Sequence, residues 1–250
     1  MENTTTIALS RLVAQSRAMD VSANNLSNAG TPGFRTERML FSDWLMREPT
    51  STGSSSLPPG GRVLSYTQDR ATYRDKQEGT LTHTANQLDL AINGDGFFTI
   101  NTPRGPRLSR SGHFERAPDG TITDATGQPL LDTTGQKLTL TPSDTILTVS
   151  ANGTISSQNG KIGQIGIVAP DDPNKMRAEG GRLLASDSAT TPVAAPQMTQ
   201  GALEDSNVAP TQELTRMMTD LREFQFTSQF VSAEADRQQS AIDKITQRRS

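Results

Sequence analysis

Histidine is the side chain best suited to act as a metal ligand or a general base near neutral pH, and this chain has 2, His83 and His113. Neither has a second histidine one helical turn away, the spacing by which a helix presents two ligands to one metal. The chain has no cysteine, which removes thiolate ligands, thiol catalysis and disulfides together. We therefore predict no metal site, with both histidines in turns or at the surface.

The run 93–96, Asn-Gly-Asp-Gly, is rich enough in glycine to cradle an ion or a phosphate. In the register of a helix–loop–helix calcium site, Ala91 and Thr102 would stand where that loop needs carboxylates. As a dinucleotide loop, the run would continue to a third glycine, but Thr99 stands there and no helix is predicted to follow. We interpret the run as a tight turn between strands.

Carboxylates are spread along the chain and cannot be paired from the sequence, so a glycosidase-type acid pair is an unsupported alternative. Arg104, Arg107, Arg110 and Arg116 concentrate positive charge across one predicted hairpin. They form either a solvated face or a docking patch for an acidic neighbour. The residue types predict no catalytic residue, no cofactor, no small-molecule substrate and therefore no enzyme.

The overall composition excludes other classes of protein. With 24 Lys plus Arg against 27 Asp plus Glu, the net charge of -3 lacks the basic footprint of a nucleic-acid binder. No stretch approaches the roughly 18 consecutive apolar residues of a membrane span, so we expect no direct membrane insertion. The first residues have no basic region or apolar run, which argues against a cleaved signal peptide. An apolar content of 32% predicts a modest core with extended or partner-dependent flanks.

The pattern of apolar residues divides the N-terminal part of the chain into predicted secondary-structure elements. Residues 4–28 predict a helix, because apolar side chains recur there at intervals of three and four. The run 34–46 predicts a short helix, 50–61 has the composition of a linker, and 63–73 alternates weakly as an extended segment.

The middle of the chain predicts strands. Two apolar runs, 88–92 and 97–100, flank the turn at 93–96 as a hairpin, and further glycine turns recur up to residue 160. This spacing favours an antiparallel β domain without a strict repeat.

The C-terminal segment predicts the longest helix, over 211–247, with an unbroken 3-4 spacing of mostly apolar residues. Phe226, Phe230 and Met218 form a second apolar patch on another face, which predicts burial on more than one side. The fold class is α+β, a central and mainly antiparallel β domain flanked by heptad-patterned helices that pair in an assembly. Its predicted segments are an N-terminal helix (1–30), an extended linker (31–80), a β-rich domain (81–200) and a C-terminal helix (201–250).

Isolated helices without a packing surface are marginal, so we predict that residues 1–28 and 211–250 order on assembly. The residues expected to pack between the helices or between subunits are Leu12, Met19, Leu26, Leu221, Phe224, Phe226, Phe230 and Val231.

Three motifs, in chain order and spread over nearly the whole chain, resemble the family of bacterial flagellar rod, hook and hook-associated axial proteins. The motif residues are Ala23, Asn24, Asn25, Asn28, Gly33 and Phe34; Gly94, Gly96, Phe97 and Phe98, followed by the run 108–114; and Gly201, Ser206, Asn207 and Val208. The chain departs from the family pattern at 29–30, 209–210 and 224–225. We expect Asn24, Asn25 and Asn28 to cap helix ends or to bond neighbouring backbone.

The resemblance implies a structural, non-enzymatic role. Such proteins leave the cell through the flagellar type III export apparatus without a cleaved signal. They polymerise with themselves and with other rod subunits in the periplasm, their terminal helices lining the tube and their β domain lying outside. Length and opening residues look most like the proximal rod proteins. The distal rod proteins are the alternative, and a secreted adhesive β protein is a more distant one.

Overall fold

The computed structural model describes residues 2–47, 63–180 and 182–247. The chain divides into two compact units. We call the first, made of Met1–Leu26, Glu37–Tyr73 and Ala209–Ser250, the helical unit. We call the second, made of Ser27–Thr36 and Arg74–Val208, the β unit.

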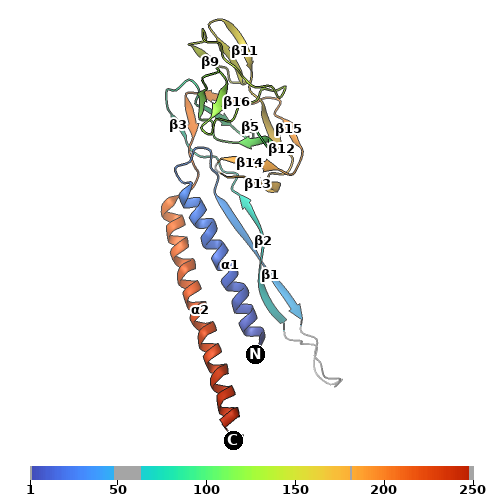
Figure 1. Ribbon diagram of the computed structural model, residues 1–250, viewed down its shortest axis with the longest axis vertical. Coiled ribbons are helices and arrows are strands. Elements are labelled where there is room, and N and C mark those ends of the chain that lie inside the picture. The colour runs from blue at the N-terminus through green and yellow to red at the C-terminus, as the bar shows by residue number, and fades with distance from the viewer. Residues whose placement is uncertain (1, 48–62, 181, 248–250) are drawn as a thin grey trace. The chain divides into compact units, whose positions relative to one another are not determined.

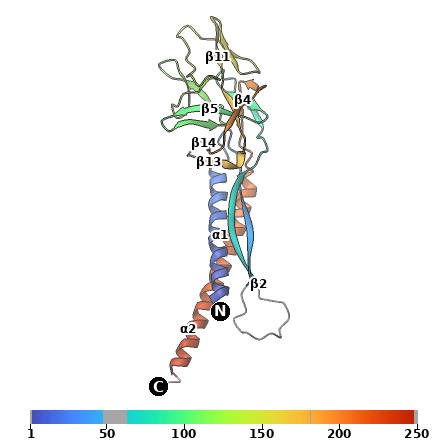
Figure 2. The same ribbon diagram turned by 90° about the vertical axis from the view of Figure 1, so that its right-hand side faces the viewer.

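The helical unit contains two helices and a two-stranded sheet. Helix α1 (Glu2–Ser27) lies beside the longer α2 (Pro210–Gln247), as Figures 1 and 2 show. Strand β1 (Glu37–Arg47) pairs with β2 (Val63–Arg74). The extended segment predicted over 63–73 is confirmed as β2, whereas the linker predicted over 50–61 falls outside the described residues.

The short helix predicted over 34–46 is wrong, because β1 occupies most of that run. Its apolar residues occupy both odd and even positions, so they do not alternate as in a half-buried strand. Periodicity alone does not distinguish such a short apolar strand from a short helix. The deciding factor is the partner strand β2, which supplies the backbone hydrogen bonds and is distant in sequence.

The helices begin and end where local chemistry allows. α1 ends at Ser27, and Thr31 N then donates to Asn28 O at 3.1 Å in the following turn. α2 begins at Pro210, which suits a first helical turn, and Glu213 lies near its positive end. The C-terminal segment predicted over 201–250 thus contains a strand, Ala202–Glu204, before the helix begins.

The β unit is built from short antiparallel strands. Its strands are β3 (Leu81–His83), β4 (Leu90–Asn93), β5 (Phe97–Thr102), β6 (Gly105–Ser109), β7 (Phe114–Arg116), β8 (Ile122–Asp124), β9 (Leu147–Val149), β10 (Thr154–Ser157), β11 (Gly160–Gln164), β12 (Ile167–Pro170), β13 (Met176–Ala178), β14 (Leu183–Ser186), β15 (Thr190–Pro192), β16 (Gln197–Gln200) and β17 (Ala202–Glu204), with a 3-10 turn at Pro173–Lys175. Its largest sheet has 6 strands in the order β13-β14-β6-β5-β12-β15, and β11-β10-β9 form a 3-stranded sheet. The predicted α+β class with antiparallel sheets between two terminal helices is confirmed.

The predicted hairpin across residues 93–96 is wrong in its pairing. Both strands exist, but β4 pairs with β16, whereas β5 pairs with β6 and β12. Gly94 and Gly96 have φ values of 88° and 154°, a backbone that L side chains rarely adopt. The turn therefore sends the two strands to different sheets.

The core lies in the β unit. Phe98 and Phe114 are fully buried and meet edge to face, with ring centroids 5.1 Å apart. Around them pack branched aliphatic side chains from several sheets, among them Ile100, Ile122 and Leu130. Burying an aliphatic or aromatic side chain contributes about 1.5–3 kcal/mol, so this cluster stabilises the unit.

Two consecutive loops of the β unit repeat one geometry. In the loops 124–128 and 132–136, both Asp-x-Thr-Gly-Gln, the aspartate Oδ1 accepts from the threonine and glutamine amides at 2.8–2.9 Å. Ile122, Leu130 and Leu138, beside these loops, join by backbone hydrogen bonds in a closed ring of 2.9, 2.9 and 3.2 Å. This short repeat is not among the features predicted from the sequence.

Candidate functional site

The apolar residues predicted to pack between helices are not the buried residues of the helical unit. Leu12, Met19, Leu26, Phe224 and Val231 are half-buried. Leu221, Phe226 and Phe230 are exposed, at 45%, 74% and 46%. The buried positions are instead small or polar: Ala8, Ala14, Gln15, Ser22, Asn25 and Glu213. Among the side chains that the structure describes, no closed heptad seam joins α1 and α2, and the packing roles stay predictions.

Polar contacts join α1 to α2. Arg11 and Gln15 both reach Glu223 Oε2, at 3.3 Å and 3.1 Å. Asn25 Nδ2 donates to Glu213 Oε2 at 3.2 Å, and Asn25 is itself buried. Hydrogen bonds to charged groups contribute about 1.5–3 kcal/mol where they are shielded from water. The buried end of the helix pair therefore depends on Asn25 and Glu213.

Asn25 also fixes the start of β1. Its Oδ1 accepts from Glu37 N and its Nδ2 donates to Glu37 O, both at 2.9 Å, as a neighbouring strand would. Asn25 therefore bonds backbone 12 residues further along the chain and does not cap a helix end. Arg38 Nη1 then donates to Glu213 Oε1 at 2.8 Å, which compensates the buried carboxylate.

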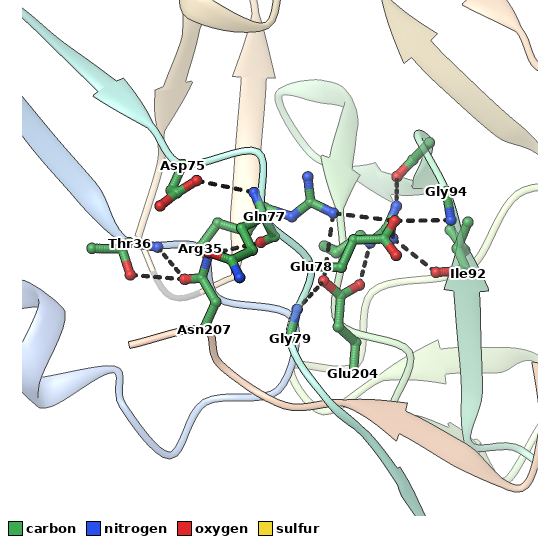
Figure 3. A network of polar contacts seen from close by, with 12 residues as sticks. Arg35, Thr36, Asp75, Gln77, Glu78, Gly79, Ile92, Gly94, Glu204 and Asn207 are labelled. Carbon is green, nitrogen blue, oxygen red and sulfur yellow. Dashed lines mark hydrogen bonds and ion pairs between the residues drawn. The ribbon is translucent and has the colours of Figure 1, made fainter. Parts of the chain in front are cut away.

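A second polar cluster, which we call the motif junction, lies in the β unit around Arg110. Figure 3 labels its residues Arg35, Glu78 and Glu204. Arg110 Nε donates to Glu204 Oε2 at 2.5 Å, and its two terminal nitrogens donate to the carbonyls of Gly96 at 2.5 Å and Ile92 at 2.8 Å. The side chains of Arg110 and Glu204 are only 2% and 3% exposed. The fixed fork of the guanidinium suits three acceptors that lie in different directions.

The chain segments that enter and leave the β unit meet at this junction. Gly33 N donates to Glu204 O at 2.7 Å, and Arg35 lies 3.4 Å from the Glu204 carboxylate. Asn207 Oδ1 accepts from Thr36 N at 2.8 Å and from Thr36 Oγ1 at 2.7 Å. Residues from opposite ends of the sequence thus share one hydrogen-bonded cluster.

Two glycines of the motifs are required by this geometry. Gly33 has a φ of 73°, and a Cβ there would lie 2.5 Å from the carbonyl carbon of Arg110. Gly94 N donates to Glu78 Oε1 at 2.9 Å, and Glu78 lies 3.4 Å from Arg110. Gly33 therefore lets backbone approach Arg110 closely, whereas at Gly94 a Cβ would meet nothing within 4 Å and it is the positive φ that favours glycine.

The remaining motif residues have simpler positions. Phe97 and Phe98 belong to the core of the β unit, Val208 is buried, and Phe34 and Gly201 are half-buried. Ser206 Oγ accepts from Val208 N at 3.3 Å, and Asn28 contacts Thr31. Ala23 and Asn24 lie exposed on α1.

The four arginines form neither the solvated face nor the docking patch that the sequence left open. Arg110 is buried, and Arg107 forms a two-pronged pair with Glu179 at 2.7 Å and 3.2 Å. Arg116 donates to the carbonyls of Thr141 and Asp144. These three guanidinium groups have partners within the chain, although Arg116 is exposed, and Arg104 lies mostly in solvent at 78% exposure.

Two further titratable clusters of the β unit, at His113 and at Asp144, have hydrogen-bond partners within the chain. His113 Nδ1 lies 2.8 Å from Asp89 Oδ1, and Asp89 also accepts from Thr84 and Asn86. Hydrogen bonds from Ser157, Thr141 and Asn159 hold the pKa of Asp144 well below its usual range. Among the described residues no group of three or more metal-ligating side chains comes together, and no described helix is long and apolar enough to cross a membrane.

Comparison with known proteins identifies the family. The chain is 32% identical to the flagellar basal-body rod protein FlgF of Caulobacter vibrioides over 98% of both chains. It belongs to the flagellar basal-body rod protein family. It is also 30% identical to FlgF of Mesorhizobium japonicum over 98% of both chains. The flagellar basal-body rod protein FlgG of Bacillus subtilis is 30% identical, over 86% of this chain and 88% of that protein.

Three models of flagellar domains match the chain in order. The flagella basal body rod model matches residues 6–35, and the flagellar hook protein FlgE/F/G D1 domain matches residues 91–172. The flagellar basal body rod FlgEFG C-terminal model matches residues 199–244. The family predicted from the sequence motifs is confirmed. The rod-family models at 6–35 and 199–244 include the motif junction residues Gly33, Arg35, Glu204 and Asn207.

Proposed function

We propose that this chain is a subunit of the proximal part of the flagellar rod, the periplasmic shaft that transmits torque from motor to hook. The observation that carries the proposal is the similarity to FlgF proteins along 98% of the chain. The role is mechanical and involves no catalysis, cofactor or small-molecule substrate. The chain reaches the periplasm through the flagellar type III export apparatus without a cleaved signal.

The helical unit supports a role in polymerisation. Its two helices expose large apolar side chains, namely Leu9, Val13, Met218, Phe226 and Ile242. Such side chains stabilise a protein when they are removed from water, so their exposure in the single chain favours burial in an assembly. Burial against copies of this chain and other rod subunits would contribute about 25 cal/mol for each Å² of apolar surface removed from water. We propose that Leu12, Met19, Leu26, Leu221, Phe224, Phe226, Phe230 and Val231 form these contacts.

Ordering of the helices on assembly belongs to the same proposal. In the helical unit, α1 and α2 join through a few polar contacts and small side chains rather than through an apolar seam. Helix pairs with so little apolar burial are marginal in water. Hydrogen exchange in the monomer should therefore be fast for residues 5–24 and 214–244, and slow once the chain is in the rod.

Deletion of the gene in its own bacterium tests the function. A rod subunit is required before the hook is built, so the deletion strain should lack hooks and filaments and be non-motile. A plasmid copy of the gene should restore both. Normal hooks and swimming in the deletion strain would contradict the proposal.

The distal rod is the second candidate, because FlgG proteins also match this chain at up to 30% identity. Electron cryomicroscopy of basal bodies that carry a tagged copy distinguishes the two. Tag density at the motor end of the rod supports the proximal assignment, and density adjoining the hook supports the distal one.

A further inference from the structure

The chain passes between the helical unit and the β unit at four connections, which lie at residues 26–27, 36–37, 73–74 and 208–209. Segments beside three of these connections meet in the β unit at the side chain of Asn207. Its Oδ1 accepts from Thr36 N at 2.8 Å and from Thr36 Oγ1 at 2.7 Å. Its Nδ2 donates to Gln77 O at 2.7 Å. Figure 3 labels Thr36, Gln77 and Asn207 in this cluster.

The partners of Asn207 allow its amide only one orientation. Thr36 N can only donate and Gln77 O can only accept, so exchanging the amide oxygen and nitrogen would break both hydrogen bonds. Asp75 N also donates to Thr36 O at 2.9 Å. Thr36 is 2% exposed, so its backbone groups need such partners. The three chain segments therefore share one hydrogen-bonded cluster centred on Asn207.

Asn25 makes the corresponding contacts inside the helical unit. Its Oδ1 accepts from Glu37 N, and its Nδ2 donates to Glu37 O and to Glu213 Oε2. All three residues lie close in sequence to one of the four connections. Each unit thus uses one asparagine to join the chain segments beside three connections.

The two asparagine clusters meet at the peptide group between Thr36 and Glu37, which are consecutive residues of different units. The oxygen of that group, Thr36 O, is bound in the β unit by Asp75 N at 2.9 Å. Its N–H, on Glu37, is bound in the helical unit by Asn25 Oδ1 at 2.9 Å. Because a peptide group is planar and rigid, it cannot rotate without breaking hydrogen bonds in both units.

We propose that Asn207 and Asn25 are positioning residues that make the 36–37 connection rigid, so that a load on one unit passes to the other. The proposal deepens the proposed function and, for the transmission of torque, rests on it. Hydrogen-bonded segments open as cooperative groups, so the segments that Asn207 joins should open together rather than singly. A subunit that transmits torque needs such a connection, because a segment that opens alone extends before it bears load.

Amide hydrogen exchange in the full-length chain, measured by NMR, tests whether each asparagine acts across the connection. In Asn207→Ala, the amides of Thr36 and Glu37 should both exchange at least about tenfold faster than in wild type. The effect at Glu37 is the decisive one, since its acceptor Asn25 is unchanged in this variant. Asn25→Ala should accelerate exchange at Thr36 in the same way, because coupling between two sites is reciprocal.

Two further variants separate this role from a loss of stability. Asn207→Asp can still accept from Thr36 but cannot donate to Gln77 O, so it should accelerate exchange at Glu37 less than Asn207→Ala does. Asn86→Ala is the matched control, because Asn86 is an asparagine of the β unit with side-chain hydrogen bonds of its own, to Leu88 N and to the Asp89 carboxylate. It should leave exchange at Glu37 unchanged.

Two results of the exchange experiment overturn the proposal. If Glu37 exchanges at the wild-type rate in Asn207→Ala, each asparagine acts only within its own unit. If Asn86→Ala accelerates Glu37 as much as Asn207→Ala does, these amides report general unfolding of the β unit. Both measurements use the purified chain, so they hold whether or not the chain is a rod subunit.

Swimming against increasing viscosity tests the load itself. Cells that carry Asn207→Ala in place of the wild-type gene should lose speed more steeply with viscosity than wild-type or Asn86→Ala cells. Asn207→Asp takes its place if Asn207→Ala is not recovered in basal bodies. Wild-type swimming at every viscosity, with the variant present in basal bodies, would show that the connection does not transmit the load. Absence of the wild-type chain from basal bodies would instead contradict the proposed function.

Discussion

Replacing Arg110 by methionine is expected to destabilise the β unit strongly, because the arginine compensates a buried carboxylate. Without it, Glu204, which is 3% exposed, keeps Arg35 at 3.4 Å as its one opposite charge among the described residues. The carbonyls of Ile92 and Gly96 also lose their guanidinium donors. Removing one partner of a buried ion pair costs about 3–5 kcal/mol, and the two carbonyls place this variant at the upper end.

Urea unfolding followed by far-ultraviolet circular dichroism measures this loss, and thermal unfolding gives a second value. A change of 1 kcal/mol shifts the melting temperature by about 2–4 °C at this size, so a loss of about 5 kcal/mol should lower it by roughly 10–20 °C. Arg104→Met is the matched control. Arg104 is 78% exposed and 3.9 Å from Glu179, and exposed pairs contribute about 0–1 kcal/mol.

Arg110→Lys separates charge from geometry. Lysine keeps the positive charge but lacks the planar fork that reaches Glu204 and two carbonyls, so its loss should fall between wild type and Arg110→Met. If Arg110→Met loses no more free energy than the Arg104→Met control, the reasoning about the buried pair is refuted.

Three further changes test the helical unit. Asn25→Ala should lower the free energy of unfolding by about 2–4 kcal/mol, since it removes two hydrogen bonds to the Glu37 backbone and the one to Oε2 of the buried Glu213 carboxylate, which keeps Arg38 on Oε1; urea unfolding within 1 kcal/mol of wild type would argue against that role. Phe226→Ser should leave monomer stability nearly unchanged, because the ring is 74% exposed, yet reduce incorporation into basal bodies; equal incorporation by immunoblot removes Phe226 from the assembly contacts. Asp220→Asn should raise the melting temperature most at neutral pH, because burial raises the pKa of Asp220 and the charged carboxylate is therefore costly in the folded chain. This stabilisation should shrink as pH falls through the raised pKa toward the ordinary value of 3.8, since the folded chain binds the proton more tightly than the unfolded chain does. A difference between the melting temperatures of variant and wild type that does not change with pH would contradict this.

Much of the architecture could be predicted from periodicity. The terminal helices and the antiparallel middle of the chain follow from spacing of three and four at the ends and of two between glycine turns. The β1–β2 pair could not be predicted, because apolar residues of the run 34–46 occupy both odd and even positions and show no alternation. Its partner strand β2 lies beyond the polar sequence 50–61. Pairing between segments that are distant in sequence leaves no local signal. For the same reason, the sequence predicts that β4 pairs with β5, whereas its partner in the structure is β16.

The polar clusters were harder to predict than the fold. The sequence groups Arg110 with three other arginines as a predicted charged surface. Sequence spacing does not show that Glu204, 94 residues further along the chain, pairs with Arg110. Asn25 was expected to act locally, whereas its partner Glu37 lies on the next element. One signal was available: Gly33 and Asn207 belong to motifs at opposite ends of the chain, and a glycine that backbone must approach closely often marks such a junction.

Immunoblotting of detergent-purified basal bodies from the bacterium that carries this gene tests the central claim most directly. If the chain is a rod subunit, it should copurify with the rod, remain after the filaments are removed, and be absent from the deletion strain. Recovery of the chain only in the cytosol or the medium, with none in basal bodies, would contradict the account.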